Sequence, residues 1–148
     1  MRFCIQVVKQ ASVGIEGRTV SSIGPGMLVL LGVGKEDDEA VADKMNAKLL
    51  KMRIFSDPDG KTNLSLGDIE GELLLVSQFT LYADLRHGNR PSFTNSMGPA
   101  RAEELYNYVA DKIRPQVKKL GLGEFGADMQ VSLINDGPFT VILDSADI

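Results

Sequence analysis

The sequence has one cysteine, Cys4, and one histidine, His87, and their scarcity excludes several kinds of site. A single cysteine cannot form a disulfide within the chain, which fits a reducing compartment such as the cytoplasm. Zinc sites built from thiolates and imidazoles need several such ligands, so the chain cannot assemble one. We therefore expect no metal and no cofactor, and we interpret Cys4 as a small apolar residue of a strand.

The usual side chains for nucleophilic catalysis are also missing. A serine–histidine–acid triad would have to use His87, and its loop of glycine and arginine is poorly suited to hold a base within about 3 Å of a nucleophile. No Gly-x-Ser-x-Gly elbow is present. Thr80 is a weak nucleophile near neutral pH unless a base lies beside it. If the protein cleaves an ester, backbone amides or the substrate itself must supply the catalytic groups.

The chain lacks long apolar runs and an excess of positive charge. No stretch approaches the roughly 18 apolar residues of a membrane span, and the N-terminus has no signal-peptide pattern, so we expect a cytoplasmic protein without membrane contact. The net charge is −4, and the one local basic cluster along the sequence is Arg86, His87 and Arg90. Proteins that coat phosphate backbone are usually basic. If the protein binds a nucleic acid, we therefore expect it to contact a short end rather than a long duplex.

Two stretches stand out from a composition that is ordinary for one globular domain over residues 1–148. The apolar run Leu73–Val76 predicts a strand buried on both faces, and it continues into Ser-Gln-Phe-Thr-Leu-Tyr-Ala-Asp over Ser77–Asp84. Polar groups at such a strand end must find partners or line a cavity. The second stretch, Asn135–Thr140, reads Asn-Asp-Gly-Pro-Phe-Thr. Taken alone, each stretch also fits a purely structural role: the first as the end of a strand, and the second as a hairpin turn.

The remaining pattern predicts two helices and several strands. Strands are expected at 2–8, 11–15, 18–23, 27–33, 73–76, 128–135 and 139–144, with a hairpin turn at Glu16-Gly17. Asp37-Asp38 offers an N-cap for one helix, Pro99 opens the other, and Pro115 ends or kinks that second helix. The apolar stripes of these helices are Val41, Met45, Leu49 and Met52, and Ala102, Leu105, Val109 and Ile113. This order indicates an α+β fold with mostly antiparallel pairing.

Taken together, these motifs resemble the D-aminoacyl-tRNA deacylase family, also called D-tyrosyl-tRNA deacylases, over nearly the whole chain. The likeness rests on these segments in chain order: Ile5–Gln6, Ala11–Val13, Gly24–Val33, Arg53–Phe55, Asn63–Ser65, Ser77–Asp84, Gly88–Phe93, Phe125–Leu133 and Asn135–Pro138. The resemblance implies a β-barrel-like sheet with two main helices packed outside, working as a homodimer. It implies hydrolysis of D-aminoacyl esters at the 3′ end of tRNA. If the site selects by excluding an L side chain, we also expect hydrolysis of mischarged glycyl esters, because glycine has no side chain to exclude.

The resemblance also implies roles for particular residues. Ser77, Gln78, Phe79 and Thr80 would line the aminoacyl pocket, with the backbone amides of Phe79 and Thr80 as catalytic donors. Gly137-Pro138 would be a cis dipeptide that one subunit inserts into the pocket of its partner. Phe125, Ala127 and Met129 would hold the terminal adenosine.

Two departures from the family pattern bear on selectivity. Many members carry arginine directly after Ile-Gln, where this chain has Val7, and Phe139 replaces the more usual valine after Gly-Pro. If that arginine fixes the Gly-Pro segment, another group must do so here. The alternative to an enzyme is a non-catalytic dimeric module that binds a tRNA 3′ end or a nucleotide. The small number of candidate acid–base side chains is consistent with this alternative too.

Overall fold

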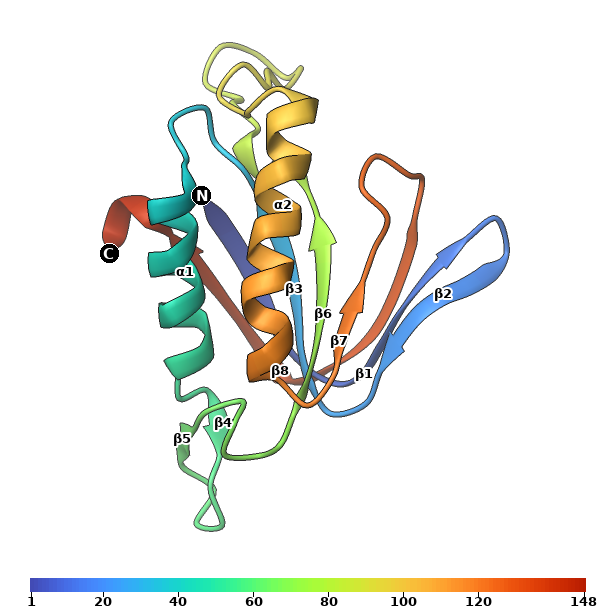
Figure 1. Ribbon diagram of the computed structural model, residues 1–148, viewed down its shortest axis with the longest axis vertical. Coiled ribbons are helices and arrows are strands. Elements are labelled where there is room, and N and C mark those ends of the chain that lie inside the picture. The colour runs from blue at the N-terminus through green and yellow to red at the C-terminus, as the bar shows by residue number, and fades with distance from the viewer.

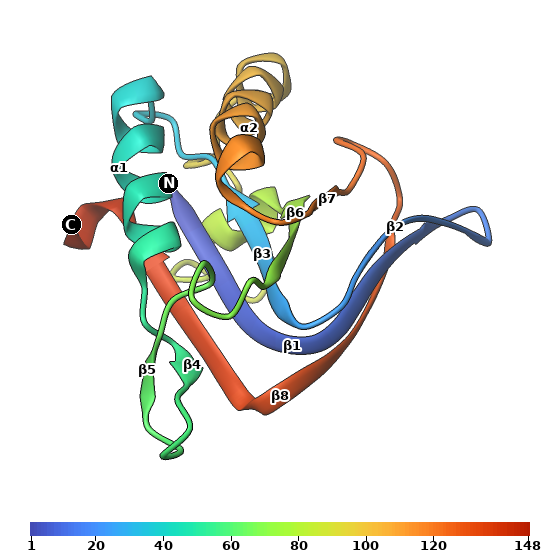
Figure 2. The ribbon, with the colours of Figure 1, turned by 60° about the horizontal axis from the view of Figure 1, so that its bottom comes forward.

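A strongly bent sheet with two helices packed against one face makes up the computed structural model, which describes residues 1–148 (Figures 1 and 2). The sheet contains β1 (Arg2–Ile15), β2 (Arg18–Ile23), β3 (Gly26–Gly32), β6 (Glu72–Ser77), β7 (Leu120–Leu122) and β8 (Gln130–Asp144). The helices are α1 (Glu39–Lys51) and α2 (Pro99–Ile113). Shorter elements are the hairpin of β4 (Phe55–Ser56) and β5 (Thr62–Leu64), and the 3₁₀ helices η1 (Phe79–Tyr82), η2 (Arg114–Gln116) and η3 (Ser145–Asp147). None of the helices is both long and apolar enough to cross a membrane.

Strand β1 organises the antiparallel part of the sheet. One of its edges pairs with β3 along Arg2–Val8 and with β2 along Ala11–Ile15, and its other edge pairs with β8. Figure 2 shows β1 and β8 bending together beneath the other strands. A Cβ at Gly121 of β7 would lie only 2.5 Å from the Ser21 hydroxyl of β2, so these two strands approach closely and nearly close the barrel. The expected barrel-like sheet with two outer helices is confirmed.

The other part of the sheet is parallel. Strand β6 lies between β3 and β7 and runs parallel to both. Parallel neighbours need a crossover connection, and α1 and α2 lie in the two crossovers. The sheet is therefore mixed, and this parallel group of three strands was not predicted from the sequence.

Strands β1 and β8 correct the sequence prediction, which divided each of them in two. Irregularities in the β1–β8 register between Gln6 and Gln10 absorb the residues that looked like breaks. A β-bulge inserts residues on one strand without ending the pairing. The Asp-Gly-Pro segment therefore lies at an irregularity within one long strand, and the hairpin alternative for it is wrong.

Local signals for the helices and buried strands are confirmed. The Asp38 carboxylate accepts the Val41 N–H at 2.8 Å as the N-cap of α1, and Pro99 occupies the first turn of α2. Residues of β3 and β6 alternate between two hydrophobic clusters, one beneath the helices and one inside the bend of the sheet. Both strands are thus buried on both faces, as the continuous apolar runs predict.

Candidate active site

A cavity of about 570 Å³ lies where the three parallel strands end. Leu31 and Val33 line it from the end of β3, and Val76 lines it from the end of β6. The segment after β7 and the first turns of α2 complete its wall. The carboxyl ends of parallel strands meet at one edge of a sheet, and this edge is where open α/β sheets bind ligands.

The cavity brings together most of the residues that the sequence singled out. Six of them line it: Ser77, Gln78, Phe79, Phe125, Ala127 and Met129. Thr80 follows in the chain but does not line the cavity, and its hydroxyl accepts a hydrogen bond from the side-chain amide of Gln78. Gly137 and Pro138 lie in the irregular segment of β8, here called the Gly137-Pro138 turn, and both are exposed. Neither residue lines the cavity of its own chain, although Val131 at the start of the same strand does.

The end of β6 leaves two backbone donors free. The Gln78 N–H donates to the Leu31 carbonyl at 2.7 Å, which closes the β3–β6 ladder, and η1 then begins. The N–H groups of Phe79 and Thr80 donate to no acceptor in the chain, because the first amides of a helical turn have no partner within it. Adjacent N–H groups of this kind are suitable donors for a developing oxyanion.

The segment after η1 packs at the mouth of the cavity. The Phe93 ring meets Phe79 edge to face, with ring centroids 5.0 Å apart, and Asp84 pairs with Ser92 through the backbone. The Arg86 guanidinium donates to both oxygens of Asp84 at 2.9 and 2.6 Å and lowers the pKa of that carboxyl to about 2. The loop is thus tied at its base, and its basic residues project from it.

Sequence reasoning missed Tyr106, which fixes the wall of the cavity. Its buried hydroxyl donates to the Leu75 carbonyl of β6 at 2.9 Å and lies 3.4 Å from the Gly123 carbonyl, and burial raises the pKa of this phenol to about 12. Its ring contacts Phe125 at a centroid distance of 5.9 Å. Tyr106 thereby joins α2, β6 and the segment after β7. The signal was available, because a tyrosine on a buried helix stripe needs a partner for its hydroxyl.

Asn135 is the second residue that sequence analysis left without a role. Its side-chain amide donates to the carbonyls of Val7 and Phe139, both at 2.9 Å, and its oxygen accepts the Phe139 N–H at 3.1 Å. The Gly137-Pro138 peptide bond is cis, as the family resemblance implies. Asn135 therefore connects both ends of this turn to β1 at Val7, the position of the departure from the family pattern noted in the sequence. The Phe139 ring packs against the hydrophobic cluster beneath the helices and anchors the turn further.

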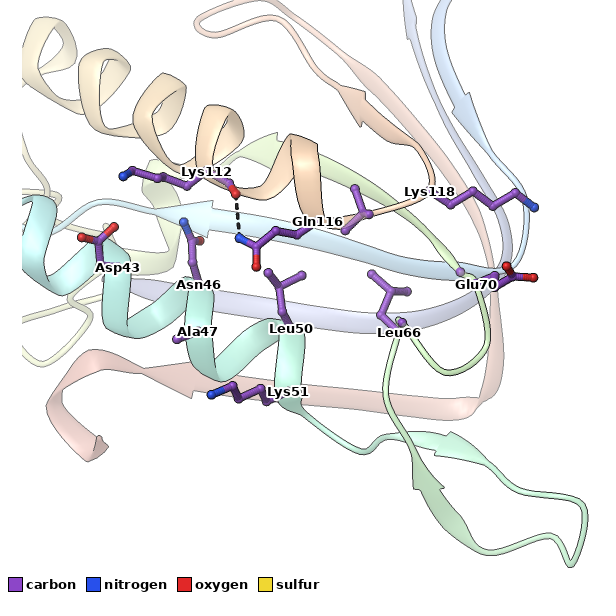
Figure 3. A pocket seen from close by; sticks show the side chains of 13 residues that line it. Asp43, Asn46, Ala47, Leu50, Lys51, Leu66, Glu70, Lys112, Gln116 and Lys118 are labelled. Carbon is purple, nitrogen blue, oxygen red and sulfur yellow. Dashed lines mark hydrogen bonds between the residues drawn. The ribbon is translucent and has the colours of Figure 1, made fainter.

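A larger cavity, of about 820 Å³, lies between α1 and the C-terminal end of α2 (Figure 3). None of the predicted site residues lines it. No group of three or more histidine, cysteine, aspartate or glutamate side chains is placed to hold a metal ion anywhere in the structure. The cavity of about 570 Å³ is the candidate active site, because it gathers the predicted site residues and Phe79, with its free N–H group, lines it.

This geometry fits a hydrolase whose catalytic groups belong to the backbone. Comparisons with known proteins identify the family. A family model described as D-Tyr-tRNA(Tyr) deacylase matches residues 4–144. A D-aminoacyl-tRNA deacylase of Thermosipho africanus is 52% identical over 100% of this chain and 99% of its own. Another, of Variovorax paradoxus, is 53% identical over 99% of this chain and 100% of its own. The chain belongs to the D-Tyr-tRNA(Tyr) deacylase family.

Solved structures support the fold. A protein named c-Myc DNA Unwinding Element Binding Protein is 39% identical, with a TM-score of 0.93 over 97% of this chain and 98% of its own. A structure described as a probable eukaryotic D-amino acid tRNA deacylase has a TM-score of 0.84 over 96% of this chain and 97% of its own. At 17% identity, the second likeness concerns the fold alone.

The position of η1 against β3 leads to the first prediction. A Cβ at Gly32 would lie 3.0 Å from the Leu81 Cβ and 3.1 Å from the Gln78 carbonyl oxygen, so Gly32→Ala must push η1 by a few tenths of an ångström. We expect D-aminoacyl-tRNA deacylation to fall by about 10-fold, because small misplacements of catalytic groups are costly. Gly67→Ala is the matched control, since its new methyl would meet only the Ser65 hydroxyl at 3.8 Å. Unchanged deacylation in Gly32→Ala would contradict the role given to η1.

Proposed function

We propose that this deacylase hydrolyses the ester bond of D-aminoacyl-tRNA with backbone groups and the help of its substrate, as a chiral-proofreading step of translation in the cytoplasm. The observation that carries the proposal is the pair of free N–H groups at Phe79 and Thr80 beside an apolar cavity. The family and its relatives at about half identity support the reaction class. The products are free D-amino acid and tRNA.

In this mechanism the ester carbonyl lies against the Phe79 and Thr80 amides, and Ser77 and Gln78 form the adjoining wall. Water adds to the carbonyl carbon, and the two amides stabilise the oxyanion that forms. The bond to the ribose oxygen then breaks, and that oxygen takes a proton. The neighbouring ribose hydroxyl, already beside the carbonyl, assists these proton transfers. The terminal adenosine packs on Phe125, Ala127 and Met129.

We further propose a homodimer in which the Gly137-Pro138 turn of one subunit enters the cavity of the other. The turn is exposed and does not line the cavity of its own chain. Strand β8 pairs only with β1, so its long outer edge is free, and Ile134 and Ile142 are 49% and 62% exposed. Free edges and exposed apolar residues favour association. The rigid turn would strike an L side chain and leave room for a D side chain or for glycine.

The competing function is a dimeric module that holds a tRNA 3′ end without turnover. The cavity contains no acid–base side chain, which fits that alternative as well. Incubation of the purified protein with D-tyrosyl- and L-tyrosyl-tRNA separates the two. The enzyme releases D-tyrosine and spares the L ester, whereas a binding module would retain both esters intact.

Thr80→Ala is expected to keep most of the deacylase activity. The side chain beside this hydroxyl is the Gln78 amide, which donates to it and cannot act as a base. Rates measured with a chelator present are expected to match those without it. A loss of about 10⁴-fold in a folded Thr80→Ala protein would indicate covalent catalysis by threonine and would overturn the backbone mechanism.

Mixing two inactive variants tests the cross-subunit site. One lacks Gly137-Pro138, and the other carries Ala127→Trp, which fills the cavity. Their heterodimer has one intact cavity facing one intact turn, so the mixture recovers activity that neither parent has. Mixing the Ala127→Trp chain with a chain that carries both changes is the control and stays inactive. Lack of recovery despite proven subunit exchange would remove the cross-subunit claim.

A further inference from the structure

A groove of about 700 Å³ on the C-terminal half of α1 has side-chain charges of one sign. Its charged side chains are all basic, and its remaining lining is apolar: Lys44, Lys48, Lys51 and Arg53, with Ala47, Met52, Ile54 and Ile148. The chain has 16 lysine and arginine residues in total and a net charge of −4. A quarter of its positive side chains therefore lie around one groove, although the sequence showed a single basic cluster elsewhere.

The charges of this groove are not neutralised by ion pairs within the chain. None of the four residues takes part in a salt bridge. Arg53 donates to the backbone carbonyl and side-chain oxygen of Asn63, which are neutral acceptors. Hydrogen bonds from Ser65 lower the pKa of Asp68, and Arg53 adds to that lowering, so one acid beyond the lining faces Arg53.

The acidic residues of α1 are directed to α2. Glu39 pairs with Arg101 at 2.7 Å, and the Asp43 carboxylate accepts the Tyr108 hydroxyl at 3.0 Å. The lysines at 44, 48 and 51 follow one another at helical spacing, where like charges repel. Favourable interaction with the helix dipole applies to the last turn. It does not account for Lys44 in the middle of α1 or for Arg53 beyond its end.

The neighbouring larger cavity has no such uniformity. It shares Ala47 and Lys51 with the groove, but its lining also includes Asp43 and Glu70. Figure 3 shows Leu50 and Leu66 within it, with Lys51 projecting on the side of α1 away from α2. A cavity of mixed charge selects no ligand of one sign. The groove on the outer side of α1 has only basic charged side chains, so it favours an anionic ligand.

We infer that this groove binds phosphates of the tRNA backbone beyond the 3′ end, an inference that rests on the proposed function. The active-site cavity includes Pro99 and Ala102 at the N-terminal end of α2, whereas the groove lies at the C-terminal half of α1. The two helices lie side by side and run in the same direction (Figure 1), and α2 alone is about 22 Å long.

An occupant of both places must therefore be long as well as anionic. A single nucleotide is too short, whereas a tRNA has a short single-stranded end followed by a duplex stem with phosphates along it. Phosphate contacts position a nucleic acid without reading its sequence. The groove thus orients the stem while the ester enters the cavity, and contact extends beyond the short end expected from net charge.

The test compares K44Q/K48Q/K51Q with K35Q/K61Q/K119Q, which removes the same charge from exposed lysines elsewhere. With D-tyrosyl-tRNA, the groove variant is expected to lose about 10-fold in kcat/KM, mainly through KM, and to show a weaker salt dependence by about one unit of slope per lost phosphate contact. With the 3′ ester of adenosine alone, which has no stem, both variants are expected to match the wild type.

Binding of uncharged tRNA, followed by fluorescence anisotropy, decides the inference independently of turnover. Weaker binding by the groove variant alone supports it. Equal weakening in both variants would mean that only total charge matters, and it would overturn the inference. Unchanged binding in the groove variant would overturn the inference as well. A wild type that hydrolyses neither ester would refute the proposed function, and the anisotropy comparison would still decide whether the groove binds RNA.

Discussion

The site depends on one topological constraint, the parallel alignment of β3, β6 and β7. Because these strands run in the same direction, their carboxyl ends meet at one edge, and the three segments that follow them surround one cavity. The last links of the ladder, from Gln78 N–H to Leu31 and from Gly123 N–H to Leu75, fix where each segment leaves the sheet. Of the two helices that make the crossovers, α2 supplies part of the remaining wall, and α1 carries the basic groove.

Side-chain hydrogen bonds to the backbone, at this edge and at the Gly137-Pro138 turn, explain how a site with so few reactive side chains is built. Tyr106 joins β6 to the segment after β7, and Asn135 joins the Gly137-Pro138 turn to β1. These side chains fix backbone, and the backbone amides of Phe79 and Thr80 remain without partners. Preorganised donors in an apolar pocket need no reorganisation when charge develops, so a main-chain site is strongest where its surroundings are held this firmly.

Local signals in the sequence predict much of this fold. The burial of β6, the N-cap of α1 and the stripe of α2 follow from periodicity and capping chemistry. The continuity of β1 and β8 does not, because bulges contain the same residues as turns. The parallel pairing and the role of Asn135, whose partner Val7 is far away in the chain, depend on contacts distant in sequence. The candidate site came from family likeness, and the cavity gathers six of its residues but not Thr80, Gly137 or Pro138.

Selectivity by exclusion of an L side chain at the Gly137-Pro138 turn is tested most directly by comparing D-alanyl-, glycyl- and L-alanyl-tRNA. A 10⁴-fold preference needs about 5.5 kcal/mol, at roughly 1.4 kcal/mol per decade. A methyl group attracted to a pocket supplies only about 1–3 kcal/mol, so a steric clash is the better source. Glycine has no side chain to clash. We therefore predict that glycyl-tRNA is hydrolysed within about 10–200-fold of D-alanyl-tRNA, while L-alanyl-tRNA survives. Equal resistance of glycyl- and L-alanyl-tRNA would mean that a D side chain is recognised positively, and exclusion by the turn would be the wrong mechanism.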